Sequence, residues 1–178
     1  MIRARLHPGL GVLLALWVSA AAAHGASPFF RLLEPGAPAP AFSLKGLDGK
    51  PHEVGSSAAG PELLFFWSVY CPNCKEAMPG LVDLYRRWAP SGLRVWAINV
   101  DGERFSNAVR AYVRGMDLPF PVLYDRLEGD LLVAADPLGV TKTPTLYLLD
   151  PEGRVLLRQA VRLEYEVVEQ ALADLPAP

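Results

Sequence analysis

The chain contains two cysteines, Cys71 and Cys74, separated by Pro72 and Asn73. The thiolate is the reactive form of cysteine, and two thiols held this close can cycle between a dithiol and a disulfide. A disulfide that closes so short a loop gains little stability, which argues against a purely structural bond. We therefore interpret the pair as a redox-active dithiol.

The pair lies where a buried strand is followed by a helix. An apolar run, residues 63–67, precedes it, and a helical pattern, residues 75–88, follows it. Cys71 then falls at or near the N-cap, where free backbone N–H groups and the helix dipole favour an anion. Pro72 takes the first helical position, which suits proline. We expect Cys71 to be the exposed attacking thiol and Cys74, one turn later, to be the shielded resolving thiol.

Metal or haem binding by the cysteines fits the sequence less well. A zinc site needs about four ligands, and the chain offers two cysteines and three histidines, of which His7 lies in a predicted targeting segment. Haem attachment needs a histidine directly after the second cysteine, and Lys75 occupies that position. A Cu(I)-binding metallochaperone stays an alternative because thiolates suit this ion, although no Met-rich tract accompanies the pair. The prediction is a redox-active disulfide with no metal and no organic cofactor.

The N-terminal residues have the pattern of a signal peptide. Arg3 and Arg5 form a positive n-region, residues 10–18 form an apolar h-region, and three alanines at 21–23 offer a cleavage site. We predict a signal peptide over residues 1–23 and a domain that works outside the cytoplasm, in the periplasm. An inner-membrane anchor through residues 6–24 that is not cleaved stays an open alternative, because this segment contains no Lys, Arg, Asp or Glu.

The rest of the chain is expected to form one domain. Residues 24–40 are rich in proline and alanine and predict a linker, which leaves residues 41–178 for the domain. The net charge of −2 argues against nucleic acid as a partner.

Strands and helices are predicted to alternate along this domain. A short hairpin is expected around residues 42–54, and strands at 93–100, 120–124, 145–149 and 154–161. Helices are expected at 105–113, 127–135 and 164–175, with the first stopped at Gly115. This order predicts an α/β fold with a central mixed sheet and helices on both of its faces.

Several motifs together resemble a known family. They are Pro35-Gly36, the run 39–44, Asp48-Gly49-Lys50, Phe66-Trp67 with Cys71–Cys74, Met78-Pro79, the run 139–145 and Asp150-Pro151-Glu152-Gly153. In these residues the chain, from about Leu33 onward, resembles the TlpA/ResA-type thioredoxin-like disulfide reductases of the bacterial envelope. The resemblance implies a thioredoxin fold with an N-terminal β-hairpin extension and an inserted αβ segment at 101–125.

The resemblance also implies roles around the dithiol. Thr143-Pro144 corresponds to the cis-proline loop that faces the disulfide and lets a partner's extended chain lie across the site. Trp67 is expected to pack beside the motif, and Tyr70 and Asn73 to form part of the exposed rim.

One position departs from the family pattern. Family members often carry a glutamate three residues after the second cysteine, where this chain has Ala77. Glu76 is one residue early, which is about 100° of helix rotation, so we expect it to face solvent. Phe65 occupies the place of thioredoxin's buried acid, and no acidic proton acceptor is assigned from the sequence.

The resemblance implies a thiol–disulfide oxidoreductase that reduces disulfides in envelope proteins, with cytochrome c maturation as one setting. It further implies a monomer that receives electrons from a membrane thiol donor of the DsbD type. The same residues allow a disulfide-forming oxidase, because direction depends on reduction potential. A peroxidase is a further alternative that the CxxC pair fits poorly.

Overall fold

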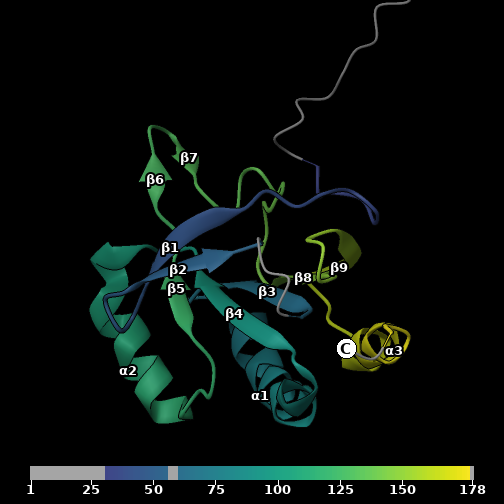
Figure 1. Cartoon of the computed structure of the whole chain (residues 1–178). Coiled ribbons are helices and arrows are strands. Elements are labelled where there is room, and N and C mark those ends of the chain that lie inside the picture. Colours follow the sequence, from purple (N-terminus) through teal and green to yellow (C-terminus); the bar gives the residue numbers. More distant parts are fainter. Residues whose placement is uncertain (1–30, 56–59, 177–178) are drawn as a thin grey trace, which may run out of the picture.

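The computed structural model describes residues 31–55 and 60–176. They form a seven-stranded mixed sheet with the strand order β2-β1-β5-β4-β3-β8-β9 (Figure 1). The strands are β1 (Phe42–Gly46), β2 (Pro51–Val54), β3 (Glu62–Trp67), β4 (Arg94–Asn99), β5 (Val122–Tyr124), β8 (Thr145–Leu149) and β9 (Val155–Ala160). A separate small hairpin pairs β6 (Leu127–Glu128) with β7 (Leu131–Leu132).

The helices are α1 (Pro72–Trp88), α2 (Ser106–Met116) and α3 (Tyr165–Ala173), with short 3-10 turns η2 (Ala89–Ser91) and η3 (Glu103–Phe105). These bounds agree with the expected helices at 75–88, 105–113 and 164–175. Helix α1 continues through its internal Pro79. Helix α2 ends at Met116, one residue beyond the predicted stop at Gly115, and its C-cap Asp117 adopts a left-handed conformation with φ 48°. Within the described ranges, no helix is long and apolar enough to cross a bilayer.

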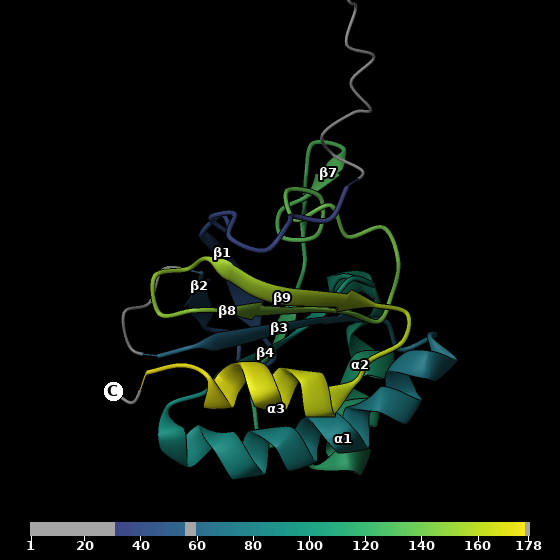
Figure 2. The same cartoon turned by 90° about the vertical axis from the view of Figure 1, so that its right-hand side faces the viewer.

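All three helices pack on one face of the sheet, so the prediction of helices on both faces is wrong (Figure 2). The parallel crossovers β3-α1-β4 and β4-α2-β5 both step in the same direction across the sheet. Because such crossovers are right-handed, two steps in one direction put both helices on the same side. The opposite face is covered by residues 32–39 and 132–140.

Strand β3 is the centre of the sheet and is buried along its whole length. It pairs in parallel with β4 and antiparallel with β8, and its last residue, Trp67, lies opposite Asn99. A strand buried on both faces is expected to be continuously apolar, as residues 63–67 are. The dithiol motif follows directly, at the edge of the sheet where the parallel strands end.

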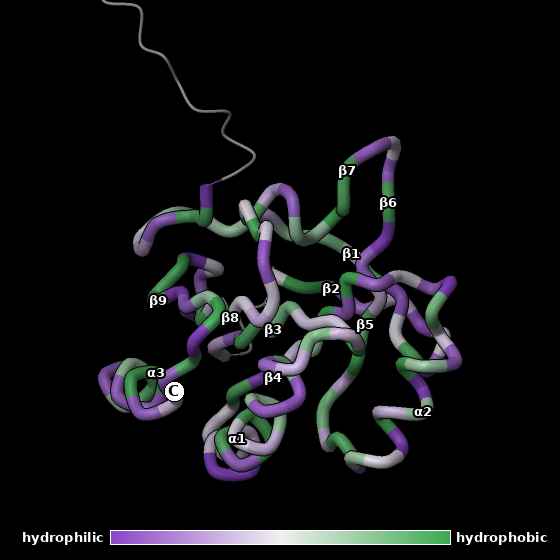
Figure 3. The backbone as a smooth tube through the Cα atoms, turned by 180° about the vertical axis from the view of Figure 1, so that it is seen from behind, coloured by the Kyte–Doolittle hydropathy of each residue, from purple (hydrophilic) through white to green (hydrophobic). Residues whose placement is uncertain are grey.

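The predicted helix at 127–135 is replaced by the β6–β7 hairpin, which projects from the body of the domain (Figure 1). Gly129 provides a left-handed turn residue with φ 63°, and the turn is hydrophilic (Figure 3). The buried carboxylate of Asp125 accepts hydrogen bonds from the backbone N–H groups of Ala134 and Ala135, which fixes the return of the hairpin. These hydrogen bonds give the segment a local alternative to a helix.

Residues 31–40 of the predicted linker lie along the sheet. The backbone N–H of Gly36 donates to the carbonyl of Val155 at 2.7 Å, and Glu34 pairs with Arg158 at 2.7 Å. Pro38 also forms a bridge with Arg154. This part of the chain is therefore attached to the domain. The predicted signal peptide lies outside the described residues.

Candidate active site

The two cysteines form a disulfide at the start of α1. Cys71 is the N-cap residue, with extended backbone angles, and its Sγ accepts a hydrogen bond from the backbone N–H of Cys74 at 3.1 Å. Pro72 occupies the first turn, and no acidic residue lies there. The Cys71 sulfur thus lies at the positive end of the helix dipole and accepts a backbone N–H. Both features stabilise a thiolate once the disulfide is reduced.

The two sulfurs differ in accessibility. Cys71 is half-buried, whereas Cys74, in the first turn of α1, is fully buried in the core. Pro72 and Asn73 between them are both exposed. This is the order of accessibility that the sequence predicts for an attacking and a resolving thiol.

The loop before β8 faces Cys71. The carbonyl oxygen of Thr143 lies 3.5 Å from the Cys71 sulfur, and the Thr143–Pro144 peptide bond is cis, as expected. The carbonyl of Pro144 accepts a hydrogen bond from the backbone N–H of Val161 at 2.7 Å. The side chain of Thr145 donates to the carbonyl of Lys142 at 2.7 Å. The first bond holds the loop against the end of β9, and the second closes a turn within the loop.

Trp67 packs beneath the motif, as expected. It is fully buried, and its ring lies 5.4 Å from that of Tyr112 on α2. Lys75, in the first turn of α1, holds its ammonium group 5.9 Å from the Tyr112 ring centre. Burial raises the pKa of the Tyr112 hydroxyl above its ordinary value. Trp67 and Tyr112 thus fix the relative positions of β3, α1 and α2 at the site.

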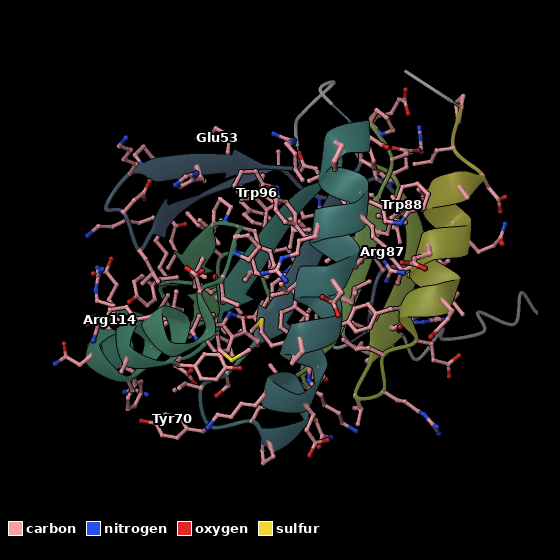
Figure 4. The ribbon with its side chains drawn as sticks, turned by 90° about the horizontal axis from the view of Figure 1, so that it is seen from below. Glu53, Tyr70, Arg87, Trp88, Trp96 and Arg114 are labelled. Carbon is pink, nitrogen blue, oxygen red and sulfur yellow. A yellow bond between two sulfur atoms is a disulfide. The ribbon has the colours of Figure 1, made fainter. Side chains whose placement is uncertain are left out.

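Tyr70 is exposed, as predicted for a rim residue, with 63% of its surface accessible. Figure 4 shows it at the edge of the molecule beside the first turn of α1. Its ring packs edge-to-face on Phe105 at 5.4 Å, and the guanidinium of Arg104 lies 4.8 Å from the Phe105 ring centre. The inserted segment therefore contributes an aromatic and a basic group to the rim.

Sequence reasoning missed Asp101, which braces the loop before Cys71. Its carboxylate accepts hydrogen bonds from the Ser68 hydroxyl at 2.6 Å, the Val69 backbone N–H at 2.7 Å and the Asn99 amide at 2.8 Å. The signal was available, because Asp101 directly follows a buried strand expected to lie parallel to β3. Polar side chains at the carboxyl ends of neighbouring parallel strands meet at one edge of the sheet.

Ala77 and Phe65 occupy the two positions where related proteins carry an acid. Phe65 is fully buried, and Glu76 is exposed, as expected. The carbonyl of Ala77 accepts a hydrogen bond from the Tyr165 hydroxyl at 2.8 Å, and burial raises the pKa of that hydroxyl. Among the residues that the structure describes, no group of three or more His, Cys, Asp or Glu side chains could hold a metal ion.

A model of the AhpC/TSA family matches residues 35–158, which contain the whole site. The chain belongs to this family. It is 32% identical over 124 residues to the thiol-disulfide oxidoreductase ResA of Bacillus thuringiensis subsp. konkukian, covering 70% of this chain and 68% of that protein. It is 35% identical over 122 residues to the thioredoxin-like protein YneN of Bacillus subtilis, covering 68% of each chain.

Solved structures agree on the fold of this AhpC/TSA member. StoA from Bacillus subtilis superposes with a TM-score of 0.62 at 22% identity, covering 77% of this chain and 98% of StoA. A secreted Mycobacterium tuberculosis disulfide oxidoreductase homologous to Escherichia coli DsbE gives a TM-score of 0.59 at 20% identity. The match covers 75% of this chain and 96% of that oxidoreductase. The thioredoxin-like fold and the CxxC pair make this protein a ResA-type thiol–disulfide oxidoreductase.

Proposed function

We propose that the protein reduces disulfide bonds of envelope proteins, with Cys71 as the attacking thiol and Cys74 as the resolving thiol. The difference in accessibility supports these roles most directly. Cys71 is half-buried at the N-terminus of α1, whereas Cys74 is fully buried. A partner disulfide can approach the first sulfur and not the second.

The reaction proceeds by two exchanges. The Cys71 thiolate attacks one sulfur of the partner disulfide, a mixed disulfide forms, and the other partner sulfur leaves as a thiolate that takes a proton from solvent. Cys74, as its thiolate, then attacks the Cys71 sulfur and releases the second partner thiolate. Two electrons pass to the partner, and the Cys71–Cys74 disulfide is left oxidised.

The surrounding residues position the partner. The Thr143 carbonyl beside Cys71 and the following Pro144 form the surface across which an extended partner segment lies. Tyr70 and Asn73 contact that segment at the exposed rim, and Trp67 supports the motif from beneath. None of these side chains exchanges electrons.

The cellular setting follows from the N-terminal pattern and the family resemblance. Residues 1–23 export the chain, and the monomeric domain, on which residues 31–40 of the predicted linker pack, works in the periplasm. A membrane thiol donor of the DsbD type returns the disulfide to the dithiol, and an uncleaved segment at 6–24 would tether the protein to the inner membrane. The disulfide of an oxidised apocytochrome c, which reduction would convert to its two thiols, is one substrate class that the resemblance implies.

Variants of the two cysteines test the assignment. Cys71→Ser is expected to abolish reduction of peptide disulfides, because no accessible nucleophile remains. Cys74→Ser is expected to attack but not resolve, so it accumulates mixed disulfides that appear on non-reducing gels and disappear with dithiothreitol. A fully active Cys71→Ser protein would refute the roles.

Reduction potential tests the direction. We expect a value near or below about −230 mV, in the range of thioredoxin-like donors. A value of about −120 mV is typical of strong oxidants. It would leave the roles of the two cysteines unchanged but would indicate that the protein forms disulfides instead of reducing them. Equilibration with glutathione or dithiothreitol followed by thiol alkylation measures it.

A further inference from the structure

Four exposed cations lie on segments that border the disulfide, and we refer to them as the basic rim: Lys75, Arg104, Lys142 and Arg162. They come from four separate parts of the chain, namely α1, η3, the loop before β8 and the segment after β9. The whole chain carries a net charge of −2. The positive groups at this place are therefore a local feature and do not reflect the overall charge.

Two of the cations are connected to Cys71 through its nearest neighbours. Lys75 follows one turn after Cys71, and its backbone N–H donates to the Cys71 carbonyl at 3.3 Å. Lys142 directly precedes Thr143, whose carbonyl oxygen lies 3.5 Å from the Cys71 sulfur. Both side chains extend from backbone that borders the reacting sulfur.

The other two cations follow β4 and β9, which lie on opposite sides of β3 in the sheet order. Arg104 lies over Phe105, which packs on the exposed ring of Tyr70, the residue before Cys71. Arg162 lines a groove of about 470 Å³ together with Asn73, which lies between the two cysteines. A partner chain that crosses the disulfide therefore meets positive charge at both ends of its path.

These cations lack ion-pair partners inside the domain. Across residues 31–55 and 60–176, the salt bridges involve other side chains and none of the basic rim. Of the nearby acids, Glu103 pairs with Lys45 at 3.2 Å. Asp101, which accepts hydrogen bonds from neutral groups only, and Glu164, two residues after Arg162, form no ion pair among the described residues. Glu76 alone adds unpaired negative charge to the groove. The four cations of the basic rim thus outnumber the three unpaired acids near them, and the surface around the disulfide carries a small net positive charge.

We infer that this surface selects protein substrates whose disulfide is flanked by acidic residues. The inference rests on the proposed function and adds the chemical class of its partner. The exposed Tyr70 ring supplies the kind of aromatic anchor found at the centre of protein interfaces. The basic rim around it steers a negative segment toward Cys71 and holds the segment in register.

Three synthetic peptides test the inference. Each carries the same intramolecular disulfide, flanked by Asp and Glu, by Ser and Gly, or by Lys and Arg. The reduced protein is mixed with each peptide, and the single-turnover rate of disulfide reduction is measured. We expect the acidic peptide to react fastest and the basic peptide slowest, with about a threefold change per charge that faces the rim. The spread should shrink as salt is added, because exposed charges are screened.

Charge-reversal variants assign the effect to the rim. Lys142→Glu combined with Arg162→Glu is expected to remove or invert the preference for the acidic peptide. Arg86→Glu is the matched control, since Arg86 is an exposed cation in the last turn of α1, about 22 Å from the Cys71 end of this helix. The preference is expressed as a ratio of two rates, so a general change in thiol reactivity cancels.

Other outcomes would overturn the inference in distinguishable ways. Equal rates for the three peptides would refute the inference but leave the proposed function intact. No reduction of any peptide, nor of the neutral compound 2-hydroxyethyl disulfide, would refute the proposed function itself. If the rates are equal and the protein binds vesicles of anionic phosphatidylglycerol through the rim, the surface serves a membrane and the inference is wrong.

Discussion

The carboxylate of Asp101 accepts a 2.7 Å hydrogen bond from the backbone N–H of Val69, two residues before Cys71. The same carboxylate accepts a 2.6 Å bond from the Ser68 hydroxyl, which in turn accepts one from the backbone N–H of Tyr70. The loop that carries the attacking cysteine is therefore held by the residue that follows the neighbouring strand. The position of the Cys71 sulfur depends on this contact as well as on the helix start.

Asp101→Ala is expected to lower the free energy of unfolding by about 1–3 kcal/mol, because it leaves the Val69 N–H without a partner. Ser68→Ala keeps the Val69 contact and is expected to cost less. Urea denaturation of the oxidised proteins measures both. Equal losses for the two variants would show that the backbone contact is not the important one.

Glu62→Ala is expected to destabilise the protein by about 2–4 kcal/mol, because it leaves two N–H donors without their acceptor and removes the ion pair of the partly exposed Arg94. Glu62 is 2% exposed, pairs with Arg94, and accepts hydrogen bonds from the backbone N–H of Gly55 at 2.8 Å and the Trp96 indole at 3.1 Å. Glu128, whose ion pair with Arg126 is exposed, provides the control. Glu128→Ala should change the unfolding free energy by less than about 0.5 kcal/mol.

Tyr147 makes stability sensitive to alkaline pH. Burial raises its pKa from 10.0 to about 12, and its hydroxyl donates to the Leu138 carbonyl at 2.6 Å and accepts from the Leu33 N–H at 2.9 Å. Above pH 10 the unfolded chain releases this proton while the folded protein keeps it. The free energy of unfolding that this group contributes is therefore complete below pH 10 and declines as pH rises toward 12.

Tyr147→Phe removes this titration and serves as the comparison. The stability difference between the native protein and the variant is expected to be largest at neutral pH and to shrink between about pH 10 and about pH 12. Denaturation at a series of pH values measures the difference. A difference that stays constant to about pH 12 would contradict the assigned pKa shift.

Gly139→Ala is expected to be strongly destabilising, whereas Gly129→Ala should be milder. Both glycines have left-handed φ angles, 69° and 63°, which alone cost an alanine about 1–2 kcal/mol. A Cβ on Gly139 would also collide with the backbone of Arg31 and Leu32, while the space around Gly129 is open. Thermal denaturation of the two variants should show the larger loss for Gly139→Ala, and similar losses would argue against the packing of residues 31–32 on this loop.

Local features of the sequence were sufficient to predict the dithiol and the elements beside it. Strand β8 matches its predicted range of 145–149, and Asp48-Gly49-Lys50 forms the predicted turn between β1 and β2. Such features depend on residues adjacent in the chain, where turn chemistry and hydrophobic period act directly. The prediction of a helix at 127–135 was wrong because the buried Asp125 carboxylate binds the backbone of this segment. The spacing of apolar residues does not indicate such a contact.

The sequence by itself determined that the protein carries a CxxC dithiol between a buried strand and a helix, and which cysteine caps that helix. Only the tertiary structure decided that all three helices share one face, and that Asp101 and Arg104 come to the site from 30 or more residues away. The reason is physical. A cap or turn is set by a few neighbouring residues, whereas contacts between distant segments depend on strand order and on the hand of the crossovers.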